Sequence, residues 1–237
     1  GQATFASSAI ADARLVTPIV GQMSVEEAAT IPLVFLTAWY ALHDLGSLQA
    51  GERVLIHAAA GGVGMAAVQL AQLHGAEVFG TASLPKWDVL REMGLDDAHI
   101  ASSRELSFAP AFRESTGGEG VDVVLNALAR EFIDESFGLL RAGGRFLEMG
   151  KTDVREQAWV EKNHPGMMYA SFDLMEAGQD RIQAMLSSLS ELFERGAIKP
   201  LPHLTFPMSR IAHVFRYMAQ AKHIGKLVLS NAEEAQA

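Results

Sequence analysis

The sequence predicts an α/β fold built on a doubly wound parallel sheet with helices on both faces. Two observations support this prediction. Short apolar segments rich in Val, Ile and Leu alternate with helical segments from residue 53 to residue 172, which is typical of a parallel sheet buried on both faces. The first strand also runs into a glycine-rich turn, residues 57–64, which opens a small-residue helix as in Rossmann-type nucleotide-binding units.

Composition and charge exclude several classes of protein. The chain has 237 residues, 49% hydrophobic content and a net charge of −9, so it can bury a core and offers no basic surface for nucleic acid. It contains no cysteine, which excludes disulfides, cysteine nucleophiles and cysteine-ligated zinc and suits the cytoplasm. The eight histidines show no paired metal-ligand spacing, so we expect no metal site.

No targeting or membrane segment is expected. Residues 1–4 begin no basic segment followed by an apolar one, so a signal peptide is not predicted. Residues 54–76 form an uncharged run long enough to span a bilayer. Because glycines and the polar His57 and Gln69 interrupt that run, a buried strand, turn and helix explains it better.

The N-terminal flank is expected to hold short elements. Residues 3–20 read as short strands and turns, punctuated by Pro18. Ser24 and Glu27 have capping-box spacing and predict a short helix after them. A second helix is predicted over Leu33–Leu45, which ends at a glycine.

The central region then alternates strands with helices. The predicted strands share apolar, β-branched composition and cover Arg53–His57, Glu77–Thr81, His99–Ala101, Val121–Leu125, Gly144–Met149 and Met167–Phe172. The predicted helices between them share amphipathic spacing or end at a glycine, and cover Gly64–His74, Pro85–Met93, Phe108–Ser115 and Glu131–Leu140.

The C-terminal region predicts one long helix and a small β element. The helix covers Leu174–Arg195, and an extended segment follows at Leu201–Phe206. A helix over Ser209–Ala221 and a strand over Lys226–Ser230 come next. The tail, residues 231–237, is expected to be frayed.

The glycine-rich turn is the predicted cofactor-binding segment. It comprises Ala59, Ala60, Gly61, Gly62, Val63 and Gly64. Gly61 lets the backbone approach a pyrophosphate, and Gly64 lets the helix pack closely on the strand. The unpaired N–H groups and the dipole at the helix N-terminus favour the phosphates. A tight turn that binds no ligand is the alternative.

The end of the second strand favours NADP over NAD. An acidic residue there would bind the ribose 2′-hydroxyl and repel a 2′-phosphate. The strand instead ends at Thr81, Ala82 and Ser83, and Lys86 follows. Ser83 can donate to a phosphate and Lys86 can supply charge. Alternatively, Ser83 is a helix N-cap and Lys86 is simply solvated.

Several segments together resemble the enoyl reductase domains of modular polyketide synthases and animal-type fatty acid synthases. These domains form part of the zinc-free, quinone-reductase-like branch of the medium-chain dehydrogenase/reductase superfamily. The matching segments are residues 28–32, 35–42, 56–64, 122–126, 143–153, 171–174 and 225–229. The resemblance implies a Rossmann domain over residues 33–185, with remnants of a GroES-like β-rich substrate domain at residues 1–32 and 186–237.

The resemblance also implies an activity. Such domains use NADPH to reduce a trans-2-enoyl thioester on an acyl carrier protein, adding hydride at the β-carbon and a proton at the α-carbon. Lys151 and Asp173 match the pair beside the nicotinamide that is the candidate proton donor. Read from the residues alone, Lys151 could be a solvated loop lysine and Asp173 a helix N-cap.

Further residues take their expected roles from the resemblance alone. Thr37 and Asn126 match positions on the nicotinamide side, whereas Ser103 and Arg104 match a segment near the adenosine phosphate. Their alternatives are a helix-interior threonine, a turn asparagine and surface-loop residues. Gly150 is a further expected cofactor-binding residue.

Partners and completeness follow from the same resemblance. The expected partners are an acyl carrier protein with its phosphopantetheine-bound substrate and neighbouring synthase domains, with a homodimer as an option. Complete members have a longer N-terminal part that carries an alternative tyrosine donor, so we expect a truncated domain that keeps NADPH binding better than turnover. The rival functions are a free-standing quinone or alkenal reductase and a non-catalytic NADPH-binding module.

Overall fold

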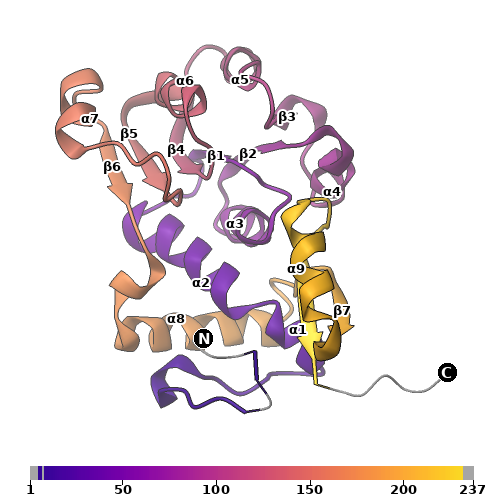
Figure 1. Ribbon diagram of the computed structural model, residues 1–237. Helices are drawn as coiled ribbons and strands as arrows, with labels where there is room; N and C mark the ends of the chain where they lie inside the picture. Colours follow the sequence, from indigo (N-terminus) through magenta and orange to yellow (C-terminus); the bar gives the residue numbers. More distant parts are fainter. Residues whose placement is uncertain (1–4, 7, 232–237) are drawn as a thin grey trace. The chain divides into compact units, whose positions relative to one another are not determined.

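The computed structural model describes residues 5–6 and 8–231 (Figure 1). The chain divides into two compact units, one of Thr37–Glu176 and one of Gly1–Leu36 with Ala177–Ala237. Each unit is described by itself below. The functional domain boundaries expected after residues 32 and 185 remain predictions.

The larger unit is built on a six-stranded parallel sheet with the strand order β3-β2-β1-β4-β5-β6. The strands are β1 (Arg53–Ile56), β2 (Glu77–Ala82), β3 (Ile100–Ser102), β4 (Val121–Asn126), β5 (Leu140–Glu148) and β6 (Met168–Ser171). The order reverses between β1 and β4, so this fold has a topological switch point at the carboxyl ends of these two strands.

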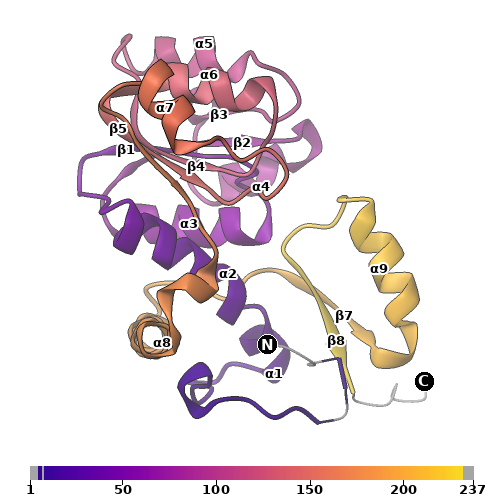
Figure 2. The same ribbon diagram turned by 60° about the vertical axis from the view of Figure 1, so that its left-hand side comes forward.

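Helices cover both faces of this sheet. Helix α3 (Gly62–Leu73) lies on one face, and α5 (Phe108–Ser115) and α6 (Glu131–Leu139) lie on the other (Figures 1 and 2). The remaining helical segments of the unit are a π-helix (Tyr40–Leu45), η3 (Leu84–Lys86), α4 (Trp87–Glu92), η4 (Asp97–His99) and α7 (Gln157–Asn163). The core under α5 and α6 is aromatic: Phe79, Phe108, Phe112, Phe137 and Phe146 are fully buried.

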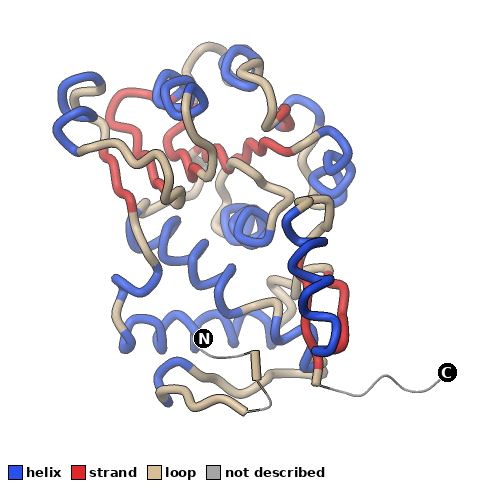
Figure 3. Tube along the Cα trace, in the orientation of Figure 1, coloured by secondary structure: helices blue, strands red, loops and turns tan. Residues whose placement is uncertain are grey.

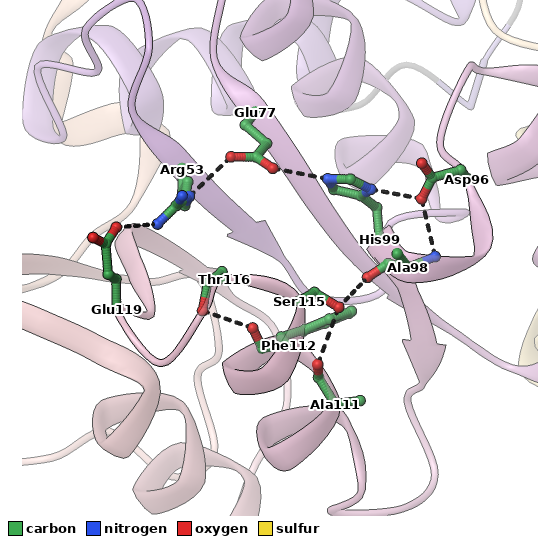
Figure 4. Close-up of polar contacts among 10 residues, drawn as sticks. All are labelled: Arg53, Glu77, Asp96, Ala98, His99, Ala111, Phe112, Ser115, Thr116 and Glu119. Atoms are coloured by element: carbon green, nitrogen blue, oxygen red, sulfur yellow. Dashed lines mark hydrogen bonds and ion pairs between the residues drawn. The ribbon is translucent and has the colours of Figure 1, made fainter.

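The amino edge of the sheet is closed by a chain of ion pairs (Figure 4). Arg53 at the start of β1 binds Glu77 at 2.9 Å and Glu119 at 2.7 Å. Glu77 also contacts His99 at 3.0 Å, and His99 contacts Asp96 at 2.6 Å. Burial alone would lower the pKa of His99, but its two carboxylate partners outweigh burial and raise that pKa. The charges at this edge therefore satisfy one another.

The smaller unit contains the two ends of the chain. Its elements are η1 (Ala13–Leu15), α1 (Val25–Ala29), α8 (Gln179–Glu194), β7 (His203–Pro207), η6 (Met208–Arg210), α9 (Ile211–Ala219) and β8 (Lys226–Ser230), with β7 and β8 paired in parallel (Figure 3). Helix α2 (Pro32–Trp39) begins here and continues into the larger unit. Ser24 and Glu27 form the predicted capping box at the start of α1, with both hydrogen bonds present.

The central strands and most helices agree with the sequence predictions. The β8 and α5 ranges match in full, and the other strands differ mainly at their ends. The uncharged run at residues 54–76 is the predicted buried strand, turn and helix, and no helix in the described part of the chain is long and apolar enough to cross a membrane.

Three expectations about elements need correction, and one helix was missed. The described residues among 3–20 contain no strand, only η1; residues 3, 4 and 7 and the expected frayed tail from 232 lie outside the described range. The helix expected over Leu174–Arg195 breaks at Gly178, whose φ of 77° suits glycine, into η5 (Leu174–Ala177) and α8. The helix expected over Leu33–Leu45 changes from α2 to the π-helix at Tyr40. Helix α7 was not predicted at all.

Candidate active site

The glycine-rich turn joins β1 to α3 at the carboxyl edge of the sheet. Gly61 occupies the N-cap position of α3 with extended backbone (φ −86°, ψ 173°), and its N–H donates to the Ala58 carbonyl at 2.8 Å. A Cβ at Gly64 would lie 2.4 Å from that carbonyl oxygen and 2.6 Å from the Cα of Ala59. Only glycine therefore fits where α3 crosses the turn, and the first N–H groups of α3 open toward the edge where anions bind.

A buried histidine fastens this turn to the sheet. His57 is fully buried, with Nδ1 at 2.9 Å from Thr81 Oγ1 and Nε2 at 2.8 Å from Ser136 Oγ. Ser136 donates its own proton to the Phe132 carbonyl, so we assign His57 as the Nε2–H tautomer that donates to Ser136 and accepts from Thr81. Burial lowers the pKa of His57 to about 3, and the ring stays neutral.

The predicted residues of the adenosine end lie together at the ends of β2 and β3. The Ser103 N–H donates to the Ala82 carbonyl at 3.0 Å, which joins the two strand ends. Ser83 has N-cap backbone geometry, but its side chain makes no capping hydrogen bond. Burial and the neighbouring Arg104 both lower the pKa of Lys86. Lys86 and Arg104 are therefore near enough for their charges to interact, and an anionic group beside them would be stabilised.

Lys151 and Asp173 meet at the ends of β5 and β6, as the sequence analysis expected. The Lys151 Nζ lies 3.6 Å from Asp173 Oδ2 and donates to the Phe172 carbonyl at 2.6 Å. Both side chains are about half exposed, at 57% and 53%. Asp173 also accepts the Met175 N–H at 3.0 Å, so the alternative capping role is present in the same residue. That hydrogen bond and the charge of Lys151 hold the pKa of Asp173 below its usual value.

The ends of β4 and β5 are joined by a buried carboxylate that the sequence analysis missed. Glu148 is 1% exposed and accepts from Asn126 Nδ2 at 2.7 Å and from the Gly150 N–H at 2.5 Å. Asn126 is fully buried and also bonds the backbone of Leu128 through both polar atoms. The available signal was a charged residue directly after the apolar pair Phe146 and Leu147; the structure makes Glu148 the register partner of Asn126.

The geometry thus brings most candidate residues to one edge. The turn, the Lys86 group and the Lys151–Asp173 pair all follow strands of the same parallel sheet at its carboxyl side. Thr37 is half-buried on α2, and its place near a nicotinamide remains a prediction, as does that of Asn126. Among the described residues, no group of three His, Cys, Asp or Glu side chains could hold a metal ion.

Comparisons with known proteins agree with this architecture. The family described as zinc-binding dehydrogenase matches residues 95–229. A pikromycin polyketide synthase component, PikAII, from Streptomyces venezuelae is 55% identical over 226 residues, which is 95% of this chain and 6% of that protein. This chain therefore spans a small part of the curated relatives it matches.

Solved structures give the same result. The crystal structure of the CurK enoyl reductase has 50% sequence identity and a TM-score of 0.87, over 92% of this chain and 66% of that one. The nucleotide-binding subdomain of the enoylreductase domain of PpsC from Mycobacterium tuberculosis has 36% identity and a TM-score of 0.64, over 72% of this chain and 97% of that one.

The family is thereby shown. The chain belongs to the zinc-binding dehydrogenases and, among them, to the enoyl reductase domains of polyketide synthases. The predicted fold class and family resemblance are both confirmed. The family and fold also make this a nicotinamide-nucleotide-binding domain.

Proposed function

We propose that the chain is an NADPH-dependent reductase of trans-2-enoyl thioesters carried on an acyl carrier protein. The observation that carries this proposal is the exposed pair of Lys151 and Asp173, 3.6 Å apart at the carboxyl ends of β5 and β6. Open α/β sheets bind their ligands outside this edge. Within the same unit, the turn at Gly61–Gly64 supplies the pyrophosphate site.

The charges near the end of β2 support NADPH rather than NADH. Lys86 and Arg104 lie close enough for one cation to lower the pKa of the other, which is an unfavourable arrangement that a bound phosphate would relieve. The β2 end itself carries no acid to repel that phosphate. A 2′-phosphate is therefore the group that this corner fits.

The proposed chemistry adds a hydride, supplied by bound NADPH, to the substrate β-carbon. The electron pair of the double bond then moves to the thioester, giving an enolate whose oxygen the Lys151 ammonium can stabilise. Because the pKa of Asp173 is lowered, this carboxyl is ionised at neutral pH and holds no proton to donate. Lys151 is thus the favoured donor of the α-carbon proton, with Asp173 orienting it.

The proposed partner follows from the proposed substrate. An acyl chain on a phosphopantetheine arm would be presented by a carrier protein, and the other synthase domains would adjoin this one. A cytoplasmic location and a homodimeric state remain predictions from the sequence.

The test is an assay of 2-enoyl thioester reduction, in which the loss of NADPH absorbance measures the rate. We expect turnover with a carrier-loaded enoyl thioester to exceed turnover with a simple quinone. Lys151→Ala should lower kcat by about 100-fold, in the range of a lost proton donor, while leaving the NADPH affinity unchanged.

The matched control is Lys162→Ala, which removes an exposed lysine from the last turn of α7. Preference for the quinone would favour the free-standing reductase. NADPH binding without turnover of any enoyl substrate, even when the tested protein includes the N-terminal part found in complete family members, would favour the non-catalytic module, and either result would overturn the proposal.

A further inference from the structure

The end of β5 contains a charged residue that the proposed reaction does not use. Glu148 closes a strand whose preceding residues, Phe146 and Leu147, are fully buried, and it is itself 1% exposed. A buried carboxylate is costly unless every lone pair it needs is satisfied. Its position three residues before Lys151 suggests that this cost has a structural purpose.

The hydrogen bonds of Glu148 join the exits of two neighbouring strands. One carboxylate oxygen accepts from the Asn126 amide at 2.7 Å, and the other accepts from the Gly150 N–H at 2.5 Å. Asn126 in turn donates to the Leu128 carbonyl at 2.8 Å and accepts the Leu128 N–H at 3.1 Å. The carboxylate therefore couples the loop after β4 to the turn that leads into Lys151.

Gly150 is matched to this carboxylate in shape as well as in hydrogen bonding. A Cβ at Gly150 would lie 2.6 Å from Glu148 Oε1, which is closer than side-chain atoms pack. The turn can approach the carboxylate only because residue 150 has no side chain. Residues 148 and 150 thus act as one coupled pair.

A second tie holds the same two loops farther out. The Arg130 N–H, in the loop after β4, donates to Asp153 Oδ2 at 2.6 Å, and Arg155 pairs with Asp153 at 2.7 Å. Arg130 adopts a φ of 61°, a conformation that persists only where its surroundings enforce it. The Lys151 turn is therefore held between a buried anchor at Glu148 and an outer anchor at Asp153.

We infer that Glu148 is a positioning residue of the active site, whose carboxylate fixes the Gly150–Lys151 turn through the Gly150 N–H and Asn126. This inference rests on the proposed function only in assigning a catalytic role to Lys151. The anchoring itself follows from the two hydrogen bonds of the carboxylate. A carboxylate is required because both partners are donors, and an amide would face one of them with an N–H₂ group.

The test compares Glu148→Gln with Glu156→Gln, an exposed glutamate before α7 that serves as the matched control. We expect Glu148→Gln to lower kcat for enoyl thioester reduction by about 10- to 100-fold, the scale of a misplaced reacting group. The dissociation constant for NADPH should change much less than kcat does, since the phosphate sites lie on other strands. In a Lys151→Ala background, Glu148→Gln should have no further effect on kcat.

Amide hydrogen exchange provides a readout that does not depend on turnover. Peptides covering residues 149–153 should exchange faster in Glu148→Gln, while those covering the glycine-rich turn should match the wild type. If the wild type reduces no enoyl thioester, the proposed function fails, but faster exchange at 149–153 still supports the anchor. Unchanged exchange together with unchanged kcat, or losses that multiply with Lys151→Ala, would overturn the inference.

Gly150→Ala covers the case in which Glu148→Gln does not fold. It keeps the carboxylate charge and displaces it from the turn, so we expect the same loss of kcat, the same faster exchange and the same lack of additivity with Lys151→Ala. Wild-type kcat and exchange in Gly150→Ala would contradict the role assigned to the pair.

Discussion

The amino and carboxyl edges of the six-stranded sheet differ in how their charged and polar groups are arranged. At the amino edge, Arg53, Glu77 and His99 form a continuous chain of ion pairs in which each charge has a partner (Figure 4). At the carboxyl edge, α3 presents its N-terminal N–H groups and Lys86 lies near another cation. The difference teaches that the polar groups at the amino edge join the strands to one another, whereas those at the carboxyl edge, although also bonded within the protein, lie where open α/β sheets bind their ligands.

Among changes at the carboxyl edge, we expect a substitution of Gly64 to have the largest effect on stability and cofactor binding. Gly64→Ala places a Cβ 2.4 Å from the Ala58 carbonyl oxygen and 2.6 Å from the Cα of Ala59, and these are backbone atoms that cannot move aside. We expect a loss of about 1–3 kcal/mol in unfolding free energy and loss of measurable NADPH binding. Gly138→Ala is the control, because a Cβ there meets nothing within 4 Å. Equal behaviour of the two variants in thermal unfolding and cofactor titration would refute the packing argument.

The next effect concerns the choice of cofactor. Lys86→Ala should weaken NADPH binding by about 10- to 100-fold, the range of one lost charge-assisted hydrogen bond. NADH binding should change less than about twofold, because NADH lacks the 2′-phosphate. Fluorescence titration with both nucleotides measures this, with Lys162→Ala as the control. Equal losses of affinity for the two nucleotides would mean that Lys86 does not contact the 2′-phosphate.

At the amino edge we expect a change in stability without a change in binding. Glu77→Gln weakens the contacts to both Arg53 and His99, which are partly exposed, so the unfolding free energy should fall by about 1 kcal/mol. The dissociation constant for NADPH should stay within about twofold of the wild type. Denaturant unfolding and cofactor titration would show this, and Glu156→Gln should change neither. A clear loss of NADPH affinity would mean that the two edges are coupled.

The smallest expected effect is the pH dependence of His99. Its carboxylate partners raise its pKa, so the folded state holds the proton more tightly than the unfolded state. The stabilisation is present below the ordinary histidine pKa of about 6.5 and is lost as the pH rises through the folded value. We expect His99→Gln to cost at most about 1 kcal/mol near pH 5.5, and less at higher pH. A stability difference that grows with pH would contradict this sign.

The elements that the sequence predicted well are those with a strong local signal. The strands from Arg53 onward are largely apolar at their centres and alternate with helices, so both the parallel sheet and the cofactor turn could be expected, whereas the strand order is known only from the structure. Ser24 and Glu27 fixed the start of α1 because a capping box depends only on neighbouring residues. Only the family resemblance predicted that Lys151 and Asp173 lie together, because the two residues are far apart in the sequence. Lys151 binds the carbonyl of Phe172, the residue before Asp173, across a separation of 21 residues.

The elements that the sequence did not predict depend on contacts between distant segments. Gly178 could have been tolerated within a helix, and only its backbone conformation shows the break before α8. The side chain of Glu148 would be expected at the surface from its residue type, and it is buried because Asn126 and Gly150 satisfy both of its oxygens. Local propensity contains neither kind of information.

Arg53 also indicates the order in which the sheet forms. Its side chain binds Glu77, 24 residues later, whereas its backbone N–H binds Asp122, 69 residues later. Closing the longer loop costs more chain entropy and is slower, so we expect β1 and β2 to pair before β1 and β4. The switch point that makes the nucleotide site would then form only after β1 and β2 have paired, so a nucleotide could bind only after that step of folding.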